Sequence, residues 1–242
     1  MTGGSRGIGR AVAQRFAEEG ARIAVHYANN EVAALDVLEE LHGDGHIAVQ
    51  ADLGAGQARL LVDETIERLG RIDVLVNNAG IYEAHPILTT GEEAWAASWR
   101  RTISTNLIGP ADLMHAVAPL MVELGGGRIV NITSRGAFRG EPDHAAYGAS
   151  KAALNSLTQS AAKALAPHGI YVTAVAPGFV DTDMAAPYLH GPDGAAVIAQ
   201  SPMGRAATVD EIARVVVFLA SPGSESTTGT IVDVNGASYL RT

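Results

Sequence analysis

A tyrosine and a lysine four positions apart, Tyr147 and Lys151, are suited by type and spacing to proton transfer. If this segment is helical, the two side chains share one face, so the lysine ammonium can lie beside the phenol. A phenol ordinarily ionises at about pH 10, and a neighbouring positive charge lowers its pKa toward neutrality, where a proton donor and acceptor works best. Ser134 would add a neutral hydrogen-bond donor for a carbonyl oxygen.

Tyr-x-x-x-Lys alone is a weak signal, because any amphipathic helix can carry it. The elements around these residues therefore decide whether a catalytic role is favoured. The helix predicted over 146–165 is rich in alanine, and the segment 128–133 before Ser134 is apolar enough for a central strand. A serine at the end of a strand and a tyrosine–lysine pair on the next helix would meet in the crevice where open α/β sheets bind ligands. This context favours a catalytic role.

A glycine-rich turn at residues 2–9 opens the chain, and the apolar residues after it have helical spacing. Gly3, Gly7 and Gly9 would let the backbone turn tightly and approach a pyrophosphate, whose charge the helix amino terminus receives. A glycine pattern needs flanking strands to be specific. The strand after it is present at 21–27.

The end of the strand 21–27 bears on which dinucleotide would bind. An acidic residue there would hold a ribose hydroxyl and select NAD(H), whereas this chain has Tyr27 and Asn29 in that place. Arg6, within the glycine turn, can pair with a 2′-phosphate. NADP(H) is therefore favoured over NAD(H); the alternative is that Arg6 is a solvated loop residue.

The remaining segments alternate between predicted strands and helices. Helices are predicted near 31–41, 57–69, 94–124, 146–165 and 209–220, and strands near 47–51, 72–76, 128–133, 170–175 and 230–234. Such alternation indicates one Rossmann-type α/β domain over residues 1–242, a doubly wound parallel sheet flanked by helices. The segment 183–204 is predicted to be a mobile substrate lid with a short helix near 195–200.

Composition excludes several classes of function. The formal net charge is −9 and no run of Lys or Arg occurs, which argues against nucleic acid as a partner. The chain has no cysteine, which excludes disulfides and thiolate catalysis and is compatible with the cytoplasm. The longest apolar runs are far shorter than the ~20 residues that span a bilayer, and no signal peptide precedes the first motif. The eight histidines show no metal-binding pair, so we expect no metal.

These motifs together resemble the short-chain dehydrogenase/reductase family, and in particular its 3-oxoacyl-carrier-protein-reductase-like subgroup. The resemblance covers nearly the whole chain. Besides the glycine turn, Ser134, Tyr147 and Lys151, it includes Asp52-Leu53, Asn77-Asn78-Ala79-Gly80, Asn106, the segment 177–182 and a tail over 202–229. It implies an NADP(H)-dependent enzyme that interconverts a carbonyl and a secondary alcohol by hydride transfer, with 3-oxoacyl thioester reduction as one case, and a homotetramer.

The resemblance also assigns roles to residues. Tyr147 would exchange a proton with the substrate oxygen, Lys151 would lower the tyrosine pKa and hold the nicotinamide ribose, Ser134 would orient the carbonyl, and Asn106 would keep a water behind Lys151. The cofactor would be bound by Gly3, Ser5, Arg6, Gly7, Ile8 and Gly9, by Tyr27 and Asn29, by Asp52 and Leu53, by Asn78, Ala79 and Gly80, and by Pro177, Gly178, Val180 and Thr182.

The chain departs from the family pattern in two places. Asn235-Gly236-Ala237 stands where the family usually has Asp-Gly-Gly. Met1 stands where the last residue of the first strand is expected, so this strand, normally about six residues in the middle of the sheet, is missing from the sequence. We therefore predict a gap between two inner strands, and hypothesise a misplaced start codon or a truncated chain.

Some of these motifs also match other classes of protein. Residues 3–7 match the hydrolase elbow Gly-x-Ser-x-Gly, but that elbow needs a strand and an oxyanion loop upstream. Ser160 and Lys163 match Ser-x-x-Lys without its companion motifs. A cofactor sensor or scaffold with little or no turnover is the main alternative to an enzyme. Arg135 and Arg139 are candidates to receive an anionic group of the substrate, with solvated surface arginines as the alternative.

Overall fold

The structure is a computed structural model that describes residues 1–241. The strands are β1 (Ala24–Tyr27), β2 (Ile47–Gln50), β3 (Val74–Asn77), β4 (Gly127–Ile132), β5 (Ile170–Pro177) and β6 (Ile231–Val234). The principal helices are α1 (Gly7–Glu18), α2 (Glu31–Glu40), α3 (Ala58–Leu69), α4 (Glu92–Ile103), α5 (Gly109–Glu123), α7 (Ala145–Leu165) and α10 (Val209–Ala220). All paired strands are parallel, as predicted.

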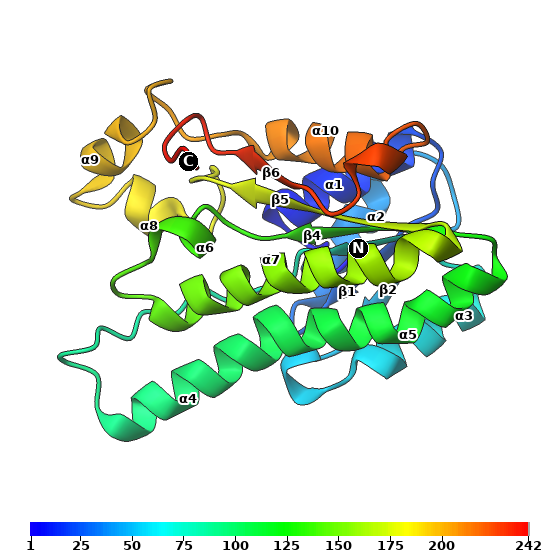
Figure 1. The fold of residues 1–242 in the computed structure, drawn as a ribbon, viewed down its shortest axis with the longest axis horizontal. Coiled ribbons are helices and arrows are strands. Elements are labelled where there is room, and N and C mark those ends of the chain that lie inside the picture. The colour runs from blue at the N-terminus through cyan, green and yellow to red at the C-terminus, as the bar shows by residue number, and fades with distance from the viewer. Residues whose placement is uncertain (242) are drawn as a thin grey trace.

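Helices cover both faces of the strands (Figure 1). One face packs against α3, α5 and α7 through a core that includes Ile129 and Val172. The other packs against α1 and α10 through a core that includes Val130 and Val175. Adjacent residues of β4 therefore point into different cores, as alternation along a strand buried on both faces requires. The predicted α/β architecture with a parallel sheet is confirmed.

The predicted helix over 94–124 is interrupted. A π-helical turn, η2 (Ser104–Ile108), lies between α4 and α5 and turns the Asn106 side chain inward, where it is fully buried. The Asn106 amide binds the Ile81 backbone at both its N–H and its carbonyl, each at 2.9 Å. The five-residue turn is therefore stabilised by a tertiary contact that helical periodicity does not encode.

The sheet is divided between β1 and β3. One part is β1-β2 and the other is β3-β4-β5-β6, and Figure 1 shows the amino terminus in the middle of the fold, where the two parts meet. The His26 amide donates to the Met1 carbonyl (3.0 Å), and the Thr2 amide donates to the Val76 carbonyl (3.1 Å). Toward the other ends of β1 and β3, a cavity of about 330 Å³ lies between the parts. The predicted gap between inner strands is thus present.

The segment 183–204 forms two short helices, α8 (Ala186–Leu189) and α9 (Gly194–Ala199). The second agrees with the predicted helix near 195–200. Figure 1 shows both helices at the end of the molecule where the one-turn helix α6 (Gly136–Arg139) and the carboxyl terminus also lie. Among residues 1–241, no helix combines the length and apolar character needed to cross a bilayer.

The departure at Ala237 has a structural counterpart. Ala237 has φ +58°, which makes it the one non-glycine residue with positive φ in the described part of the chain. Left-handed backbone costs an L-residue about 1–2 kcal/mol, a cost that glycine does not have. Its neighbour Gly236 also has positive φ. Both residues of this C-terminal turn are therefore left-handed, and only the glycine adopts that conformation without strain.

Candidate active site

A cavity of about 490 Å³ opens beyond the carboxyl ends of the strands. Most of the predicted site residues lie in its wall: Gly3, Ser5, Arg6, Gly7, Ile8, Tyr27, Asn29, Asn78, Ala79, Gly80, Ser134, Tyr147, Lys151, Pro177, Gly178, Val180 and Thr182. These residues come from six separate segments of the chain. The fold therefore gathers them at the edge where parallel α/β sheets bind ligands.

The proposed catalytic side chains share one side of this cavity. Ser134 lies two residues after the end of β4, and its Oγ accepts a hydrogen bond from the Gly136 amide (3.0 Å). Tyr147 and Lys151 lie on α7, and the Lys151 Nζ is 5.7 Å from the centre of the Tyr147 ring. The same Nζ donates to the carbonyl of Ile132 (2.8 Å), the last residue of β4. The serine, tyrosine and lysine are thus brought together as predicted.

The pKa of Tyr147 differs from the sequence-based prediction. Burial raises it to about 12, which the Ser134 hydroxyl only partly offsets, and the negative charge of Glu141 raises it further. Burial lowers the pKa of Lys151 to about 8. The predicted lowering of the tyrosine pKa is therefore wrong in sign, because desolvation of the buried phenol is the largest influence on it. At neutral pH the Tyr147 phenol is therefore protonated.

Asn106 lies behind the cavity wall rather than in it. A Cβ added to Gly80 would come within 3.3 Å of the Asn106 Oδ1 and 3.5 Å of the Lys151 Nζ. Gly80 therefore allows the lysine ammonium and the asparagine amide to approach the same point of the backbone. The Asn106 Oδ1 and Nδ2 both form hydrogen bonds with the Ile81 backbone, so Asn106 fixes the segment after β3. Its predicted role in holding a water stays a prediction.

The glycine turn is held by hydrogen bonds that motif matching did not include. The Thr2 Oγ1 accepts from the amides of Asn78 (2.9 Å) and Ala79 (3.0 Å). The Asn78 side-chain amide donates to the carbonyls of Thr2 (3.0 Å) and Gly3 (3.1 Å). Because Asn78 and Ala79 follow β3, these bonds fix the turn against the end of that strand.

His26 also holds the turn, and sequence reasoning did not identify it as a site residue. The Gly3 amide donates to its Nδ1 (3.0 Å), so the proton lies on Nε2, which contacts the Ala51 carbonyl (2.8 Å) after β2. The imidazole is buried, and desolvation lowers its pKa to about 4. The ring is therefore neutral at physiological pH and joins the glycine turn to the β1-β2 part of the sheet.

The titration of His26 makes stability depend on pH. Its pKa is lowered from the ordinary 6.5 to about 4, so the unfolded chain binds a proton in this interval that the folded chain excludes. The stabilisation is complete above about pH 6.5 and is lost as the pH falls toward 4. Between pH 7.5 and 5 we expect His26 to remove about 2 kcal/mol from the free energy of unfolding.

Denaturant unfolding at several pH values checks this expectation against the variant His26→Asn. Its Oδ1 can replace the Nδ1 acceptor without titrating. The variant should lose less stability on acidification than the original chain. Equal slopes in the two proteins would show that the loss comes from other groups.

Three features of the cavity wall suit a dinucleotide. Gly3 and Gly7 have positive φ, and a Cβ at Gly7 would be 3.3 Å from the Thr182 side chain, so the glycines leave the cavity open beside the amino terminus of α1. The carboxylates in the wall, Glu141 and Asp183, lie on neither β1 nor the glycine turn. Arg6 lines the same end of the cavity. This donor set suits a diphosphate and an added phosphate.

Three predicted cofactor residues lie outside the wall. A Cβ at Gly9 would be 2.0 Å from the Gly3 carbonyl oxygen, so Gly9 serves the packing of α1 under the turn. Asp52 caps the short 3-10 turn η1 (Leu53–Ala55) through its Oδ1, which accepts from the Gly54 amide at 2.8 Å. Leu53 is buried. The adenine contacts of Asp52 and Leu53 stay predictions.

An aromatic group covers Tyr147. Tyr82 stacks on His144 (ring centres 3.7 Å apart) and meets Tyr147 edge to face (4.7 Å). The His144 Nε2 is 2.9 Å from the hydroxyl of Tyr188 on α8. These contacts link α8 to the residue before α7. Motif reasoning missed His144 because nothing in its spacing distinguishes it from a loop residue.

The fold and the cavity are those of a dinucleotide-binding α/β protein, with a tyrosine and a lysine in the cavity wall. Residues 3–237 match a family model described as enoyl-(acyl carrier protein) reductase. The chain belongs to the short-chain dehydrogenase/reductase family, whose members are NAD(P)-dependent oxidoreductases.

Relatives and solved structures agree with this assignment. The chain is 38% identical over 243 residues to the 3-oxoacyl-[acyl-carrier-protein] reductase FabG of Staphylococcus epidermidis, covering 99% of this chain and 98% of the relative. It is 39% identical to the 3-oxoacyl-[acyl-carrier-protein] reductase of Synechocystis, covering 99% and 96%. Among crystal structures, acetoin dehydrogenase YohF from Salmonella typhimurium superposes with a TM-score of 0.86 at 31% identity, covering 100% and 96%.

Proposed function

We propose that this protein is an NADP(H)-dependent reductase that interconverts a carbonyl and a secondary alcohol, with Tyr147 as the proton donor and acceptor. The observation that supports this most directly is the convergence of Ser134, Tyr147 and Lys151 in one cavity with the glycine turn. When bound, the nicotinamide cofactor supplies or accepts the hydride. The chain itself would align the reactants and move one proton.

The roles of the individual residues follow from their positions. Tyr147, protonated at neutral pH, would give its proton to the carbonyl oxygen as the alcohol forms. Ser134 would hold that oxygen by a hydrogen bond. Lys151 would contact the nicotinamide ribose. When bound ligands exclude water from the cavity, its positive charge would be screened less and would stabilise the phenolate left after proton transfer. Asn106 and Gly80 would keep the lysine in place.

The reacting compound is a small carbonyl substrate or the corresponding alcohol. A 3-oxoacyl thioester is the first candidate, because the Staphylococcus and Synechocystis relatives carry that activity in their names. We also propose a cytoplasmic homotetramer, which rests on the family resemblance.

NADPH oxidation, followed at 340 nm with a panel of ketones, diketones and acetoacetyl thioesters, tests the proposal. Turnover of at least one carbonyl compound is expected. NADPH binding without turnover of any of them would instead indicate a cofactor sensor or scaffold.

Arg6 is expected to select NADPH. It is exposed at the cofactor end of the cavity, where no residue of β1 or the glycine turn is acidic, and a guanidinium pairs well with a phosphate. The variant Arg6→Ala should raise the Kd for NADPH about tenfold and change that for NADH much less. Fluorescence titration of both nucleotides measures this.

Arg10→Ala is the matched control, since Arg10 lies one turn further along α1 and pairs with Glu40. An equal loss of affinity for NADPH and NADH in Arg6→Ala would argue against contact with a 2′-phosphate.

A further inference from the structure

Arg135 is an unusual residue in the cavity wall because its charge is buried. Its side chain follows Ser134 directly and is 3% exposed, and with Lys151 it makes up the buried cationic side chains of residues 1–241. In this described part of the chain it forms no ion pair with a carboxylate. A buried guanidinium is costly unless an anion or strong acceptors compensate it.

A second arginine converges on the same point. The Arg135 Nη2 donates to the Gln200 Oε1 at 2.7 Å, and the Arg139 Nη1 donates to the same oxygen at 2.8 Å. Arg135 precedes α6 directly and Arg139 is its last residue, four positions later, so two like charges face one neutral amide oxygen. The geometry is that of an anion site in which Gln200 supplies the oxygen but not the charge.

The nearest acidic group does not remove this imbalance. Glu141 acts on both arginines through its charge, but it forms no ion pair with either within the described residues. Burial raises the pKa of the Glu141 carboxyl. Arg135 is instead covered on one side by the ring of Phe179, 4.8 Å from its guanidinium carbon.

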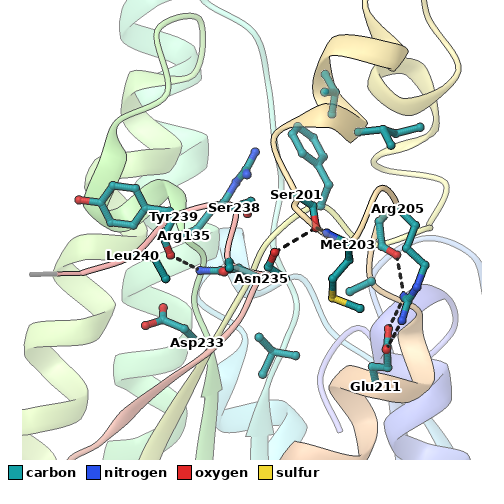
Figure 2. Close-up of a pocket in the computed structure, with 18 of the residues that line it drawn as sticks. Arg135, Ser201, Met203, Arg205, Glu211, Asp233, Asn235, Ser238, Tyr239 and Leu240 are labelled. Atoms are coloured by element: carbon teal, nitrogen blue, oxygen red, sulfur yellow. Dashed lines mark hydrogen bonds and ion pairs between the residues drawn. The ribbon is translucent and has the colours of Figure 1, made fainter.

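Arg135 and Phe179 stand in the walls of two cavities. One is the cavity with Tyr147, and the other, of about 810 Å³, lies beneath α9 and the C-terminal segment. Figure 2 shows Arg135 between the strand of chain with Ser238 and Tyr239 and the segment that carries Ser201. The other charged side chains of the larger cavity are paired, Arg205 with Glu211 and Arg241 with Asp233. Arg135 is the charge left for a ligand.

We propose that Arg135 and Arg139 bind the carboxylate of the substrate, which takes the place of the Gln200 amide oxygen, so that the preferred substrate is an oxo acid. This inference rests on the proposed carbonyl reduction and specifies an oxo acid, in place of the 3-oxoacyl thioester, as the substrate class. The carboxylate would lie where the two cavities meet, and the carbonyl would reach Ser134 and Tyr147. Gln200, the residue after α9, would be displaced from the two guanidinium groups when the substrate carboxylate binds.

The test compares 2-, 3- and 4-oxo carboxylic acids with their methyl esters under NADPH, since each ester keeps the reacting carbonyl but replaces the carboxylate charge with a neutral methyl ester. We expect at least one acid to have a kcat/KM ten or more times that of its ester. In Arg139→Ala, whose side chain is exposed, the acid-to-ester ratio should fall about tenfold. In Arg135→Met it should fall about a hundredfold, chiefly through KM.

Gln200→Glu sharpens the test without removing either arginine. A resident carboxylate would occupy both guanidinium groups, so it should raise the melting temperature and the KM for the acid while lowering the acid-to-ester ratio. Arg241→Ala is the matched control, because it removes a paired arginine of the larger cavity and should leave the ratio unchanged. Competitive inhibition of ester reduction by butyrate, weakened in Arg139→Ala, reports on the site without turnover of the acid.

The outcomes separate the two proposals. Ester or thioester turnover with no preference for acids, and Arg139→Ala and Gln200→Glu acting equally on both members of a pair, would overturn the carboxylate site and leave the reductase in place; the arginines would then serve only to hold α9. Absence of turnover with every compound, although NADPH binds, would overturn the proposed function itself.

Discussion

The variant Tyr147→Phe is expected to lower kcat for carbonyl reduction by about 10²–10⁴-fold while the affinity for NADPH stays within a factor of about two. The substitution removes only the hydroxyl that would donate the proton. The ring remains, and with it the edge-to-face contact with Tyr82, so the fold should not change. Single-turnover oxidation of NADPH and a separate fluorescence titration measure the two quantities.

Tyr171→Phe is the control for Tyr147→Phe. Tyr171 lies on β5 outside the cavity, where its ring contacts the guanidinium of Arg128 (4.5 Å), and the same chemical change there should leave kcat unaltered. Undiminished turnover in Tyr147→Phe would mean that another group supplies the proton.

The variant Gly9→Ala is expected to weaken NADPH binding about a hundredfold and to destabilise the protein by roughly 3 kcal/mol. Helix propensity alone would favour alanine by about 1 kcal/mol. The added Cβ, however, would be 2.0 Å from the Gly3 carbonyl oxygen and 2.7 Å from the Asn78 Nδ2, which are fixed by backbone and by hydrogen bonds. The clash therefore determines the sign.

Gly91→Ala provides the comparison, since nothing lies within 4 Å of a Cβ at Gly91 and its φ is −65°. It should change stability by less than about 1 kcal/mol. Denaturant unfolding and NADPH titration of both variants decide the matter. Normal NADPH affinity in Gly9→Ala would show that the turn tolerates displacement and does not position the cofactor.

Local sequence patterns predicted the elements and the gathering of the site, because both depend on periodicity and on short motifs. The strand before Ser134 and the helix with Tyr147 and Lys151 are found where predicted, as is the gap beside Met1. Even the departure at Ala237 coincides with a backbone conformation that suits glycine better.

What sequence could not provide is set by contacts between distant segments. The π-helical turn depends on the bond of Asn106 to Ile81, and the neutral state of His26 depends on burial between Gly3 and Ala51. The sign of the Tyr147 pKa shift was predicted wrongly because spacing shows the lysine but not the desolvation of the phenol. The convergence of Arg135 and Arg139 on Gln200 joins residues more than sixty positions apart.

Because the sheet is divided, a bound nucleotide would also stabilise the fold. Tyr27 ends β1 of the two-stranded part and Asn29 follows it, whereas Gly80 follows β3, Pro177 ends β5 and Lys151 lies on α7, all on the side of the four-stranded part. A molecule lying along the cavity would contact both parts of the sheet. Its binding free energy would therefore add to the free energy of unfolding. The lifetime of the folded protein in the cell would then rise and fall with the supply of its own cofactor.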